Sequence, residues 1–458
     1  MTHIMEGSER SMLMESNLFY VPPTLTERQA VHDLYVGPSA ATFDEANDIT
    51  FEIAPSTDLI SLADMRFECE LYLYKPDGTA LTIDDGVCPI NNILSSLFQC
   101  VVVELAGRSI SDPSNLYFIR SYLENMLGYS AQAMRSQLAS EGFFWDSSQN
   151  YGSLVGTLRP AVAAVGGGPA IPAAYTWVNQ DQIDRGVLVR NNPTQLFRRI
   201  HCDIFQQDKP LIPGVTLSIK FIRSRNTVAF TAASNAQIPK AVIRKPKLFV
   251  RKFEPTASYL NALSRKLLQT PAVYHFEMVQ MRQSTINIGQ QFAEWPKMVA
   301  GQLPKMMLLG IVSSAALSGT YNTSPFNFHH YDLSYLSAEI DGKIFPSSGY
   351  VMDFANHQTL PCYDGLCRVL EVFNEADKFL PFNRSEYEKG FSLFGFDFTP
   401  TGTGRGALTL IKHGNLNLNI KFSAALTEAV VVIAYLVFDA TISINNANQA
   451  IFDFSAYT

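Results

Sequence analysis

The feature of this 458-residue chain that most constrains its fold is an internal repeat. Glu104-Leu-Ala-Gly-Arg-Ser-Ile110 aligns with Glu339-Ile-Asp-Gly-Lys-Ile-Phe345; in both, a strand end is followed by a glycine turn, a cation and a new apolar segment. Leu217-Ser-Ile-Lys-Phe221 aligns with Leu418-Asn-Ile-Lys-Phe422. A helical pattern follows each copy of the first match, and a long apolar segment follows each copy of the second. This shared order predicts two units of one fold, each about 200 residues long.

Both halves consist mainly of segments in which apolar and polar residues alternate, as in half-buried strands. In the first half these segments are 50–54, 67–74, 100–105, 196–202, 215–221 and 241–253. In the second half they are 273–278, 306–312, 336–340, 391–398, 416–422 and 430–444. The 31 Phe and 19 Tyr residues favour strands, and the 27 Gly and 24 Pro favour turns.

Two short helices interrupt these strands. In the first, Asp112 is expected to cap the helix, Pro113 to take the first helical position and Gly128 to mark the end. The second is expected to begin at Asp364. The fold class is therefore all-β: two tandem eight-stranded jelly rolls, each with a short helix inserted after its fourth strand.

The expected domain division follows from the limits of the two patterns. We expect five segments: an N-terminal arm at 1–47, a first jelly roll at 48–255, a linker at 256–271, a second jelly roll at 272–447 and a C-terminal tail at 448–458. The arm shows no sustained periodicity, and residues 145–185 are expected to form a long loop region.

Three segments of the first half resemble double jelly-roll major capsid proteins, in particular those of Polinton/Maverick elements, adintoviruses and related small animal DNA viruses. They are Phe67-Glu-Cys-Glu-Leu71 with Asp77-Gly-Thr79, Pro89-Ile-Asn-Asn-Ile-Leu-Ser-Ser-Leu-Phe98, and Val103-Glu-Leu-Ala-Gly-Arg108. The resemblance is most specific over residues 48–130. It implies a homotrimer whose six jelly rolls form a pseudo-hexagonal, hexon-like capsomer, and a shell lattice of these capsomers around double-stranded DNA. It also implies vertex and minor capsid proteins as partners.

Composition narrows the function further. The formal net charge of −7 disfavours a histone-like coat, because such proteins neutralise phosphates and are strongly basic. The longest apolar segment, 429–438, is too short to span a bilayer. We therefore expect a soluble chain made in the cytoplasm of a host cell, assembled there or in the nucleus, and located in the virion capsid. An internal membrane is left open.

The sequence contains no motif for catalysis, metal binding or cofactor binding, so we expect no enzyme activity, no metal site and no cofactor. His329 and His330 are adjacent, and we interpret them as loop or interface residues. Cys362 and Cys367, with His357 nearby, lack a second ligand pair for zinc, and buried free thiols are expected for the cysteines generally. The glycine-rich segment 402–406 lacks the lysine and helix of a phosphate-binding loop and is interpreted as a hairpin loop.

The stretch 236–266 concentrates basic residues and contains one acidic residue, Glu254. Six of the basic residues form a candidate interaction face: Lys240, Arg244, Lys245, Lys247, Arg251 and Lys252. One interpretation is the solvated face of a strand. The other is a contact with an acidic neighbouring subunit, an internal protein or, weakly, the packaged DNA.

Two other functions are compatible with a tandem β-sandwich. A carbohydrate-binding protein would need exposed aromatic residues in a groove, and Trp145, Trp177 and Trp295 show no shared spacing. A minor or vertex capsid component usually needs only one jelly roll, so the internal repeat argues against it.

Overall fold

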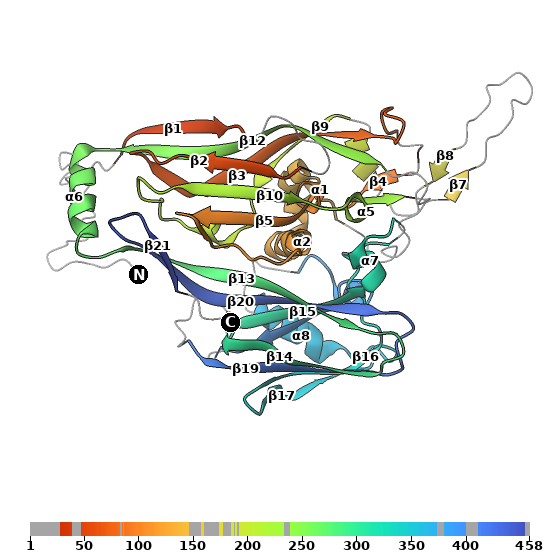
Figure 1. Cartoon of the computed structure of the whole chain (residues 1–458). Helices are drawn as coiled ribbons and strands as arrows, with labels where there is room; N and C mark the ends of the chain where they lie inside the picture. Colours follow the sequence, from red (N-terminus) through yellow and green to blue (C-terminus); the bar gives the residue numbers. More distant parts are fainter. Residues whose placement is uncertain are drawn as a thin grey trace, which may run out of the picture.

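The computed structural model describes residues 28–38, 47–82, 85, 87–145, 157–159, 174–176, 185–186, 188–189, 192–232, 239–321, 323–372, 380–399 and 411–453. Over these residues the chain forms two β-sandwiches that lie one above the other and are connected by the helix α6 (Ala257–Leu267) (Figure 1).

The first sandwich contains two four-stranded antiparallel sheets. The β12 sheet has the order β1 (Arg28–Val36), β12 (Lys240–Pro255), β3 (Leu59–Tyr74) and β9 (Thr194–Arg199). The β10 sheet has the order β2 (Ile49–Ile53), β10 (Leu217–Arg223), β5 (Phe98–Leu105) and β6 (Arg108–Ser109). Two short pairs lie outside these sheets: β4 (Val87–Pro89) with β11 (Phe230–Ala232), and β7 (Thr157–Arg159) with β8 (Ala174–Thr176).

The second sandwich repeats this arrangement. The β20 sheet has the order β13 (Ala272–Ile286), β20 (Val430–Ile444), β15 (Met306–Ser313) and β18 (Leu393–Asp397), and β21 (Ala450–Asp453) also pairs with β20. The β19 sheet has the order β14 (Phe292–Gln302), β19 (His413–Phe422), β16 (Leu333–Ile340) and β17 (Lys343–Val351).

The strand orders establish the jelly-roll topology of both sandwiches. If the eight sheet strands of each sandwich are numbered along the chain, one sheet has the order first, eighth, third, sixth. The other has the order second, seventh, fourth, fifth. The prediction of two tandem eight-stranded jelly rolls is therefore confirmed.

The aligned glycine turns of the internal repeat are equivalent hairpins. In the first sandwich Leu105 pairs with Arg108, and in the second Ile340 pairs with Lys343, so each turn has two residues. The turn residues all have positive φ: 49° and 76° at 106 and 107, and 46° and 80° at 341 and 342. This is the type I′ geometry that matches strand twist, and the glycine at the second position adopts it without steric cost.

The second match of the repeat lies in equivalent strands, since β10 and β19 are both seventh in their jelly rolls. Leu217 faces Leu105, whereas Leu416 faces the equivalent hairpin residue Ile340. The structural counterpart of Leu217 is therefore Leu416, two residues before Leu418. A shift of two residues keeps each side chain on the same face of the strand, so the alternation is unaffected.

Two parts of the expected domain division need correction. Arg28–Val36 of the expected arm form β1, which pairs with β12 from Arg28↔Pro255 to Val36↔Leu248 and is the first strand of the first jelly roll. Residues 450–453 of the expected tail form β21. The expected linker is largely the helix α6, whose first turn is capped by the Thr256 hydroxyl accepting the Tyr259 N–H.

The inserted helices also differ from the expectation. The helix α2 (Tyr117–Gly128) follows the fifth strand rather than the fourth, as does α8 (Leu360–Val369) in the second sandwich. The α2 helix begins at Tyr117 without a side-chain cap, and α8 begins four residues before Asp364 with a proline in its first turn. The short helices α1 (Ile93–Ser96), α3 (Ala131–Arg135), α5 (Asn226–Ala229), α7 (Ser314–Ser318) and α9 (Arg384–Tyr387), and the 3-10 turns η3 (Gln137–Glu141) and η5 (Asp203–Gln206), lie in connections.

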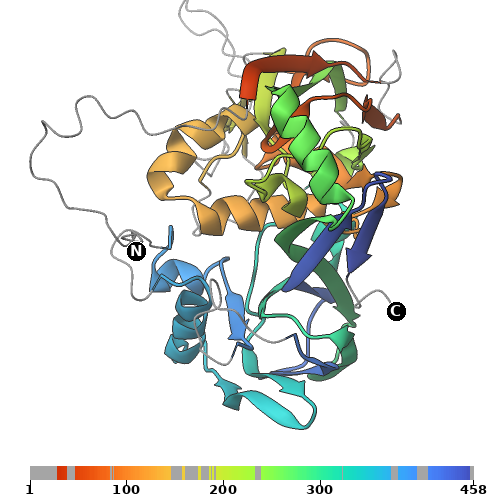
Figure 2. The same cartoon turned by 90° about the vertical axis from the view of Figure 1, so that its left-hand side faces the viewer.

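The core of the first sandwich is aromatic. The rings of Phe51, Phe67, Phe98 and Phe221 come from both of its sheets, and each has its centroid within 6.0 Å of at least two of the others, in edge-to-face and tilted arrangements. The helix α2 lies between the two sandwiches (Figure 2), and the buried apolar residues of both sandwiches and of α2 form one continuous cluster. Within the described ranges, no helix is both long and apolar enough to cross a membrane.

Candidate functional site

The joint between the two sandwiches is formed along β13, an edge strand of the β20 sheet. Two carboxylates of the first sandwich, Asp203 (buried) and Asp112 (partly buried), accept backbone N–H groups of this edge. Asp203 Oδ2 accepts Val279 N–H at 3.1 Å, and Asp112 Oδ2 accepts Met281 N–H at 3.0 Å. Asp112 therefore does not cap α2; it binds a strand 169 residues away in the sequence. Carboxylates are strong acceptors, so they satisfy donors that a sheet edge would otherwise leave unpaired.

The other end of the same edge is satisfied by donors from the first sandwich. The Gln207 side chain donates to the His275 carbonyl at 2.7 Å, and Lys209 Nζ donates to the Val273 carbonyl at 3.3 Å. The Tyr274 hydroxyl accepts the Ile212 N–H at 3.1 Å and donates to a neighbouring carbonyl. The free edge of β13 is thus paired by side chains of the first sandwich along much of its length.

A buried charge cluster lies behind these contacts. The Arg120 guanidinium of α2 forms an ion pair with Asp203 and another with Glu124, whose Oε1 lies 2.8 Å from Nε. The side chains of Arg120 and Asp203 are only 4% and 2% exposed. Tyr435 of β20 donates its hydroxyl to Glu124 at 3.5 Å, so the cluster includes the second sandwich. Buried charges of this kind are stable only when every partner is in place.

His201 extends the cluster within the first sandwich. Its Nδ1 lies 2.7 Å from Glu124 Oε2, and its Nε2 lies 3.8 Å from Glu141 Oε2. Burial lowers the pKa of His201, but the hydrogen bonds and charges of the two glutamates outweigh it and raise the pKa to about 9. Burial raises the pKa of Glu124, but Arg120 and His201 together lower it to about 2. At neutral pH the His201–Glu124 contact is therefore an ion pair.

The pKa values of the two carboxylates on the β13 edge, Asp203 and Asp112, are raised, whereas the pKa of Glu124 is lowered. Burial raises the pKa of Asp203 to about 6, against the opposing effect of the Arg120 charge. Burial also raises the pKa of Asp112, against hydrogen bonds from Ser114 and Met281. Desolvation disfavours the charged form of each, which is the cost of placing carboxylates at this joint.

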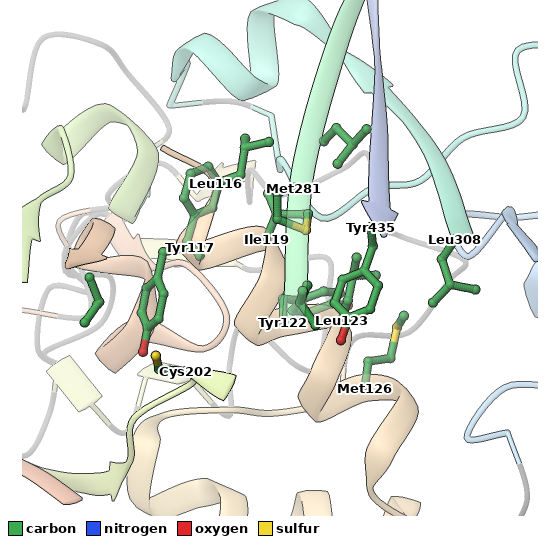
Figure 3. Close-up of a cluster of buried hydrophobic side chains, with 14 of the residues drawn as sticks. Leu116, Tyr117, Ile119, Tyr122, Leu123, Met126, Cys202, Met281, Leu308 and Tyr435 are labelled. Carbon is green, nitrogen blue, oxygen red and sulfur yellow. The ribbon is translucent and has the colours of Figure 1, made fainter. Parts of the chain in front are cut away.

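Apolar side chains fill the rest of the joint. Figure 3 shows Leu116, Ile119, Leu123 and Met126 of α2 on the side where Met281, Leu308 and Tyr435 of the second sandwich lie. The ring of Tyr122 stacks on Phe326 with centroids 4.1 Å apart. A cavity of about 650 Å³ lies beside this layer and is lined from both sandwiches, including Glu124, His201, Asp203 and Tyr435.

The candidate basic face lies on β12. Three of its cations contact acidic side chains of neighbouring strands and loops: Lys245 with Glu70 at 2.8 Å, Arg251 with Asp33 at 2.9 Å, and Lys252 with Asp58 at 4.0 Å.

Two further cations of this face lie over aromatic rings. Arg244 lies over Tyr72 with its guanidinium carbon 4.4 Å from the ring centroid, and Lys247 Nζ is 5.6 Å from the ring centroid of Tyr35. Lys240, at the start of β12, is exposed and pairs in register with Tyr74.

Cross-strand pairing with β3 further neutralises the positive charge of this face. Arg244 is opposite Glu70 and Lys247 is opposite Glu68 on β3. Cross-strand opposite charges stabilise a sheet. The local charge excess seen in the sequence is therefore partly neutralised by β1 and β3, as the interpretation of a solvated strand face requires.

The other candidate groups do not converge into a reactive site. The rings of His329 and His330 lie in a loop and stack with centroids 4.4 Å apart, and His330 also stacks on Phe354 at 4.0 Å. Their position in a loop agrees with the interpretation made from the sequence. Burial lowers the pKa of both, with His330 reaching about 4.

The residues of the zinc candidate have different surroundings. His357 binds Glu388 at 2.6 Å, while Cys362 is buried in α8, where desolvation raises its pKa to about 12. Among the described residues, no group of three or more His, Cys, Asp and Glu side chains could hold a metal ion. The glycine-rich segment 402–406, most of 145–185, and Trp177 lie outside the described residues.

Sequence reasoning missed the residues that form the joint. Asp112, Arg120 and Asp203 lie in a turn, a helix and a 3-10 turn, and no local motif connects them. One signal was present: Arg120 and Glu124 interrupt the apolar face of α2 at a spacing of four residues, which is unusual for a face that is buried.

A chain in the cryo-EM structure of the Sputnik virophage aligns over 99% of this chain and 94% of its own length, with a TM-score of 0.61 at 10% identity. The Faustovirus major capsid protein aligns over 93% and 92%, with a TM-score of 0.53 at 9% identity. A chain of the PBCV-1 virus capsid aligns over 95% and 99%, with a TM-score of 0.50 at 11% identity.

The chain is a double jelly roll. It shares this fold, over nearly its whole length, with a Sputnik virophage chain, the Faustovirus major capsid protein and a chain of the PBCV-1 capsid. No protein-family model matches the sequence. In sequence, an uncharacterized protein of Caenorhabditis elegans is 21% identical over 372 residues, covering 80% of this chain and 81% of that protein.

Proposed function

We propose that this chain is a major capsid protein of a DNA virus or virus-like mobile element. Three copies form a hexon-like trimer whose six jelly rolls give a pseudo-hexagonal outline, and the trimers tile an icosahedral shell around double-stranded DNA. The observation that carries the proposal is the full-length match of both jelly rolls, in their mutual arrangement, to a Sputnik virophage chain.

The joint supports this proposal on physical grounds. Two sandwiches that were only tethered by a linker would rotate freely, and a lattice of such units would lack a fixed spacing. Here Asp112 and Asp203 bind the edge of β13, and Arg120 is buried in the α2 layer. The pair therefore behaves as one rigid building block, as a closed symmetric ring of subunits requires.

The domain division proposed for this role follows the strand pairing. The first jelly roll begins at β1 and ends with β12, α6 connects the two, and the second extends from β13 through β21. Residues before Arg28 are proposed to act as an arm that contacts a neighbouring subunit in the shell.

Further partners and location belong to the same proposal. They are vertex and minor capsid proteins, a weak contact with packaged DNA, and a place in the virion capsid after synthesis in a host cell. Contacts with acidic neighbours are proposed for the exposed cations of β12 that lack a carboxylate contact among the described residues, Lys240, Arg244 and Lys247. The role is structural and requires no reaction.

Light scattering on the purified full chain tests the proposal. A trimer has a mass of three times 50.9 kDa and should persist at micromolar concentration, because a capsomer buries large apolar surfaces between subunits. A monomer at micromolar concentration would contradict the proposal and would favour a carbohydrate-binding or other monomeric sandwich protein.

A further inference from the structure

A second cavity, of about 270 Å³, lies between the two sandwiches at the start of α2. None of the residues that line it belongs to the lining of the cavity beside Glu124. The short helices α5 of the first sandwich and α7 of the second lie next to each other here and both contribute to its walls (Figure 1). Because the joint fixes the two sandwiches, these walls are held in a fixed relative position.

The lining of this cavity contains several amide and hydroxyl side chains that have no hydrogen-bond partner among the described residues. They come from β5, the turns before α2 and α5, β13 and α7: Gln99, Asn115, Ser224, Gln283, Thr285 and Ser314. Ser224 Oγ is also buried. Buried hydroxyl groups are nearly always hydrogen-bonded, so an unpaired one in a cavity wall indicates a partner that the chain itself does not supply.

Arg225 gives the cavity a single positive charge. Within the part of the chain that the structure describes, it is the only ionisable side chain in the lining, and it is exposed and forms no ion pair there. A guanidinium presents its N–H donors in a planar fork that fits the two oxygens of a carboxylate. A phosphate carries nearly two negative charges at neutral pH, so a single cation fits a carboxylate better.

Buried apolar side chains complete the lining. Leu116, Phe118 and Val431 are each only 4% exposed, and they can contact the methylene groups of a ligand. The volume is below the roughly 300–1,000 Å³ of sites for drug-sized ligands, so it suits one side chain and its adjacent backbone. The lining therefore fits a ligand with a short aliphatic stem, one carboxylate and nearby amide groups.

We propose that this cavity binds a glutamate side chain on an exposed peptide segment of another protein. The carboxylate pairs with Arg225, and the methylene groups contact the apolar wall. The peptide N–H and C=O groups on either side of the glutamate bond to the amide and hydroxyl side chains of the lining, including Ser224. The cavity is formed within one chain, so this inference does not depend on the proposed trimer.

Two small probes test the site on the full chain by ligand-observed saturation-transfer NMR. N-acetylglutamic acid α-amide carries the glutamate side chain and both flanking amide groups, and N-acetylglutamine α-amide differs in having an uncharged side chain. The acidic probe should bind with a dissociation constant in the millimolar range. The dissociation constant of the neutral probe should be at least about tenfold higher, because hydrogen bonds to charged groups are the stronger ones.

A matched pair of variants locates the binding. Arg225→Gln should raise the dissociation constant of the acidic probe at least about tenfold. Arg108→Gln is the control, because Arg108 is exposed in β6 and lies outside the cavity. If Arg225→Gln lowers the thermal midpoint, Gln283→Ala gives a second measurement from the other sandwich, and it should raise the dissociation constant at least about threefold.

The outcomes are distinct from those of the proposed function. Saturable binding that prefers the acidic probe, is lost in Arg225→Gln and is kept in Arg108→Gln supports the inference. Equal binding of the two probes, no binding at millimolar concentrations, or an equal loss in the two arginine variants would overturn it. A trimeric chain that fails this test loses the peptide site and keeps its proposed role in the capsid.

Discussion

Raising the pH should destabilise the first sandwich through His201. The folded-state pKa of this residue is about 9, whereas an unfolded chain has a value near 6.5. A group whose pKa is higher in the folded state stabilises the fold at pH values below 6.5, and this stabilisation is lost as the pH rises through about 9. The difference corresponds to about 3 kcal/mol at about 1.4 kcal/mol per pKa unit. His201 is 12% exposed, so solvent screening removes little of this value.

Most other groups titrate in different windows. The lowered pKa of Glu124, which results from Arg120 and His201, acts below about pH 4.5. The raised pKa of Asp203 acts below about pH 6, because its protonation there favours the folded state. The buried thiols of Cys69, Cys202 and Cys362 have pKa values raised by burial to about 12, so their effect begins near pH 9. Burial lowers the pKa of His329 and His330, so their titration in the unfolded chain opposes the effect of His201 below about pH 7. The interval from pH 7 to 9 therefore reports mainly His201.

Urea unfolding at fixed protein concentration, followed by circular dichroism, measures the effect. The free energy of unfolding of the wild type should fall by roughly 2 kcal/mol between pH 7 and 9. His201→Gln should be less stable by a similar amount at pH 7 and should approach the wild type at pH 9. Parallel pH profiles for the two proteins would refute the argument, because they would show that His201 does not gain its proton from the Glu124 contact.

Two further predictions concern the sheets. Lys245→Glu should lower the free energy of unfolding of the first sandwich, because it places a second carboxylate beside Glu70, and adding Glu70→Lys should restore it. Urea unfolding of both variants measures this, and a single variant as stable as the wild type would mean that the ion pair contributes nothing. Gly310→Ala should lower the free energy of unfolding by about 1–3 kcal/mol, because its Cβ would lie 2.5 Å from the Phe328 ring. Gly128→Ala is the control, because there is open space around its Cβ. Similar thermal midpoints for the two variants would contradict the close packing at Gly310.

The repeated hairpins show which features can be read from a sequence. The pairs Gly107-Arg108 and Gly342-Lys343 lie in turns whose geometry is local, so the residues identify the turn directly. Strands such as β10 were equally clear, because one face is buried and the alternation is regular. Where local chemistry determines structure, the prediction was correct.

β1 was missed for a physical reason. Its residues are exposed on both faces in the single chain, so they show no clean alternation, and its strand conformation depends on pairing with β12 more than 200 residues later. The strand β6 has two residues and is too short to show a period. Because β6 was missed, the helix α2 was predicted after the fourth strand instead of the fifth. Both errors concern contacts that no local window contains.

The joint could not be predicted for the same reason. Asp112, Arg120 and Asp203 acquire their roles only when α2, η5 and β13 come together. The ion pairs of the basic stretch could not be predicted either, because Glu70 and Asp33 come from other strands.

Electron microscopy of the purified full-length chain tests the central claim most directly. Class averages of negatively stained particles should show hexagonal, six-lobed capsomers, alone or tiled into shells, because each of three chains contributes two similar jelly rolls fixed by the joint. Featureless particles of the size of one chain, across the micromolar range, would contradict the account of this protein as a major capsid protein.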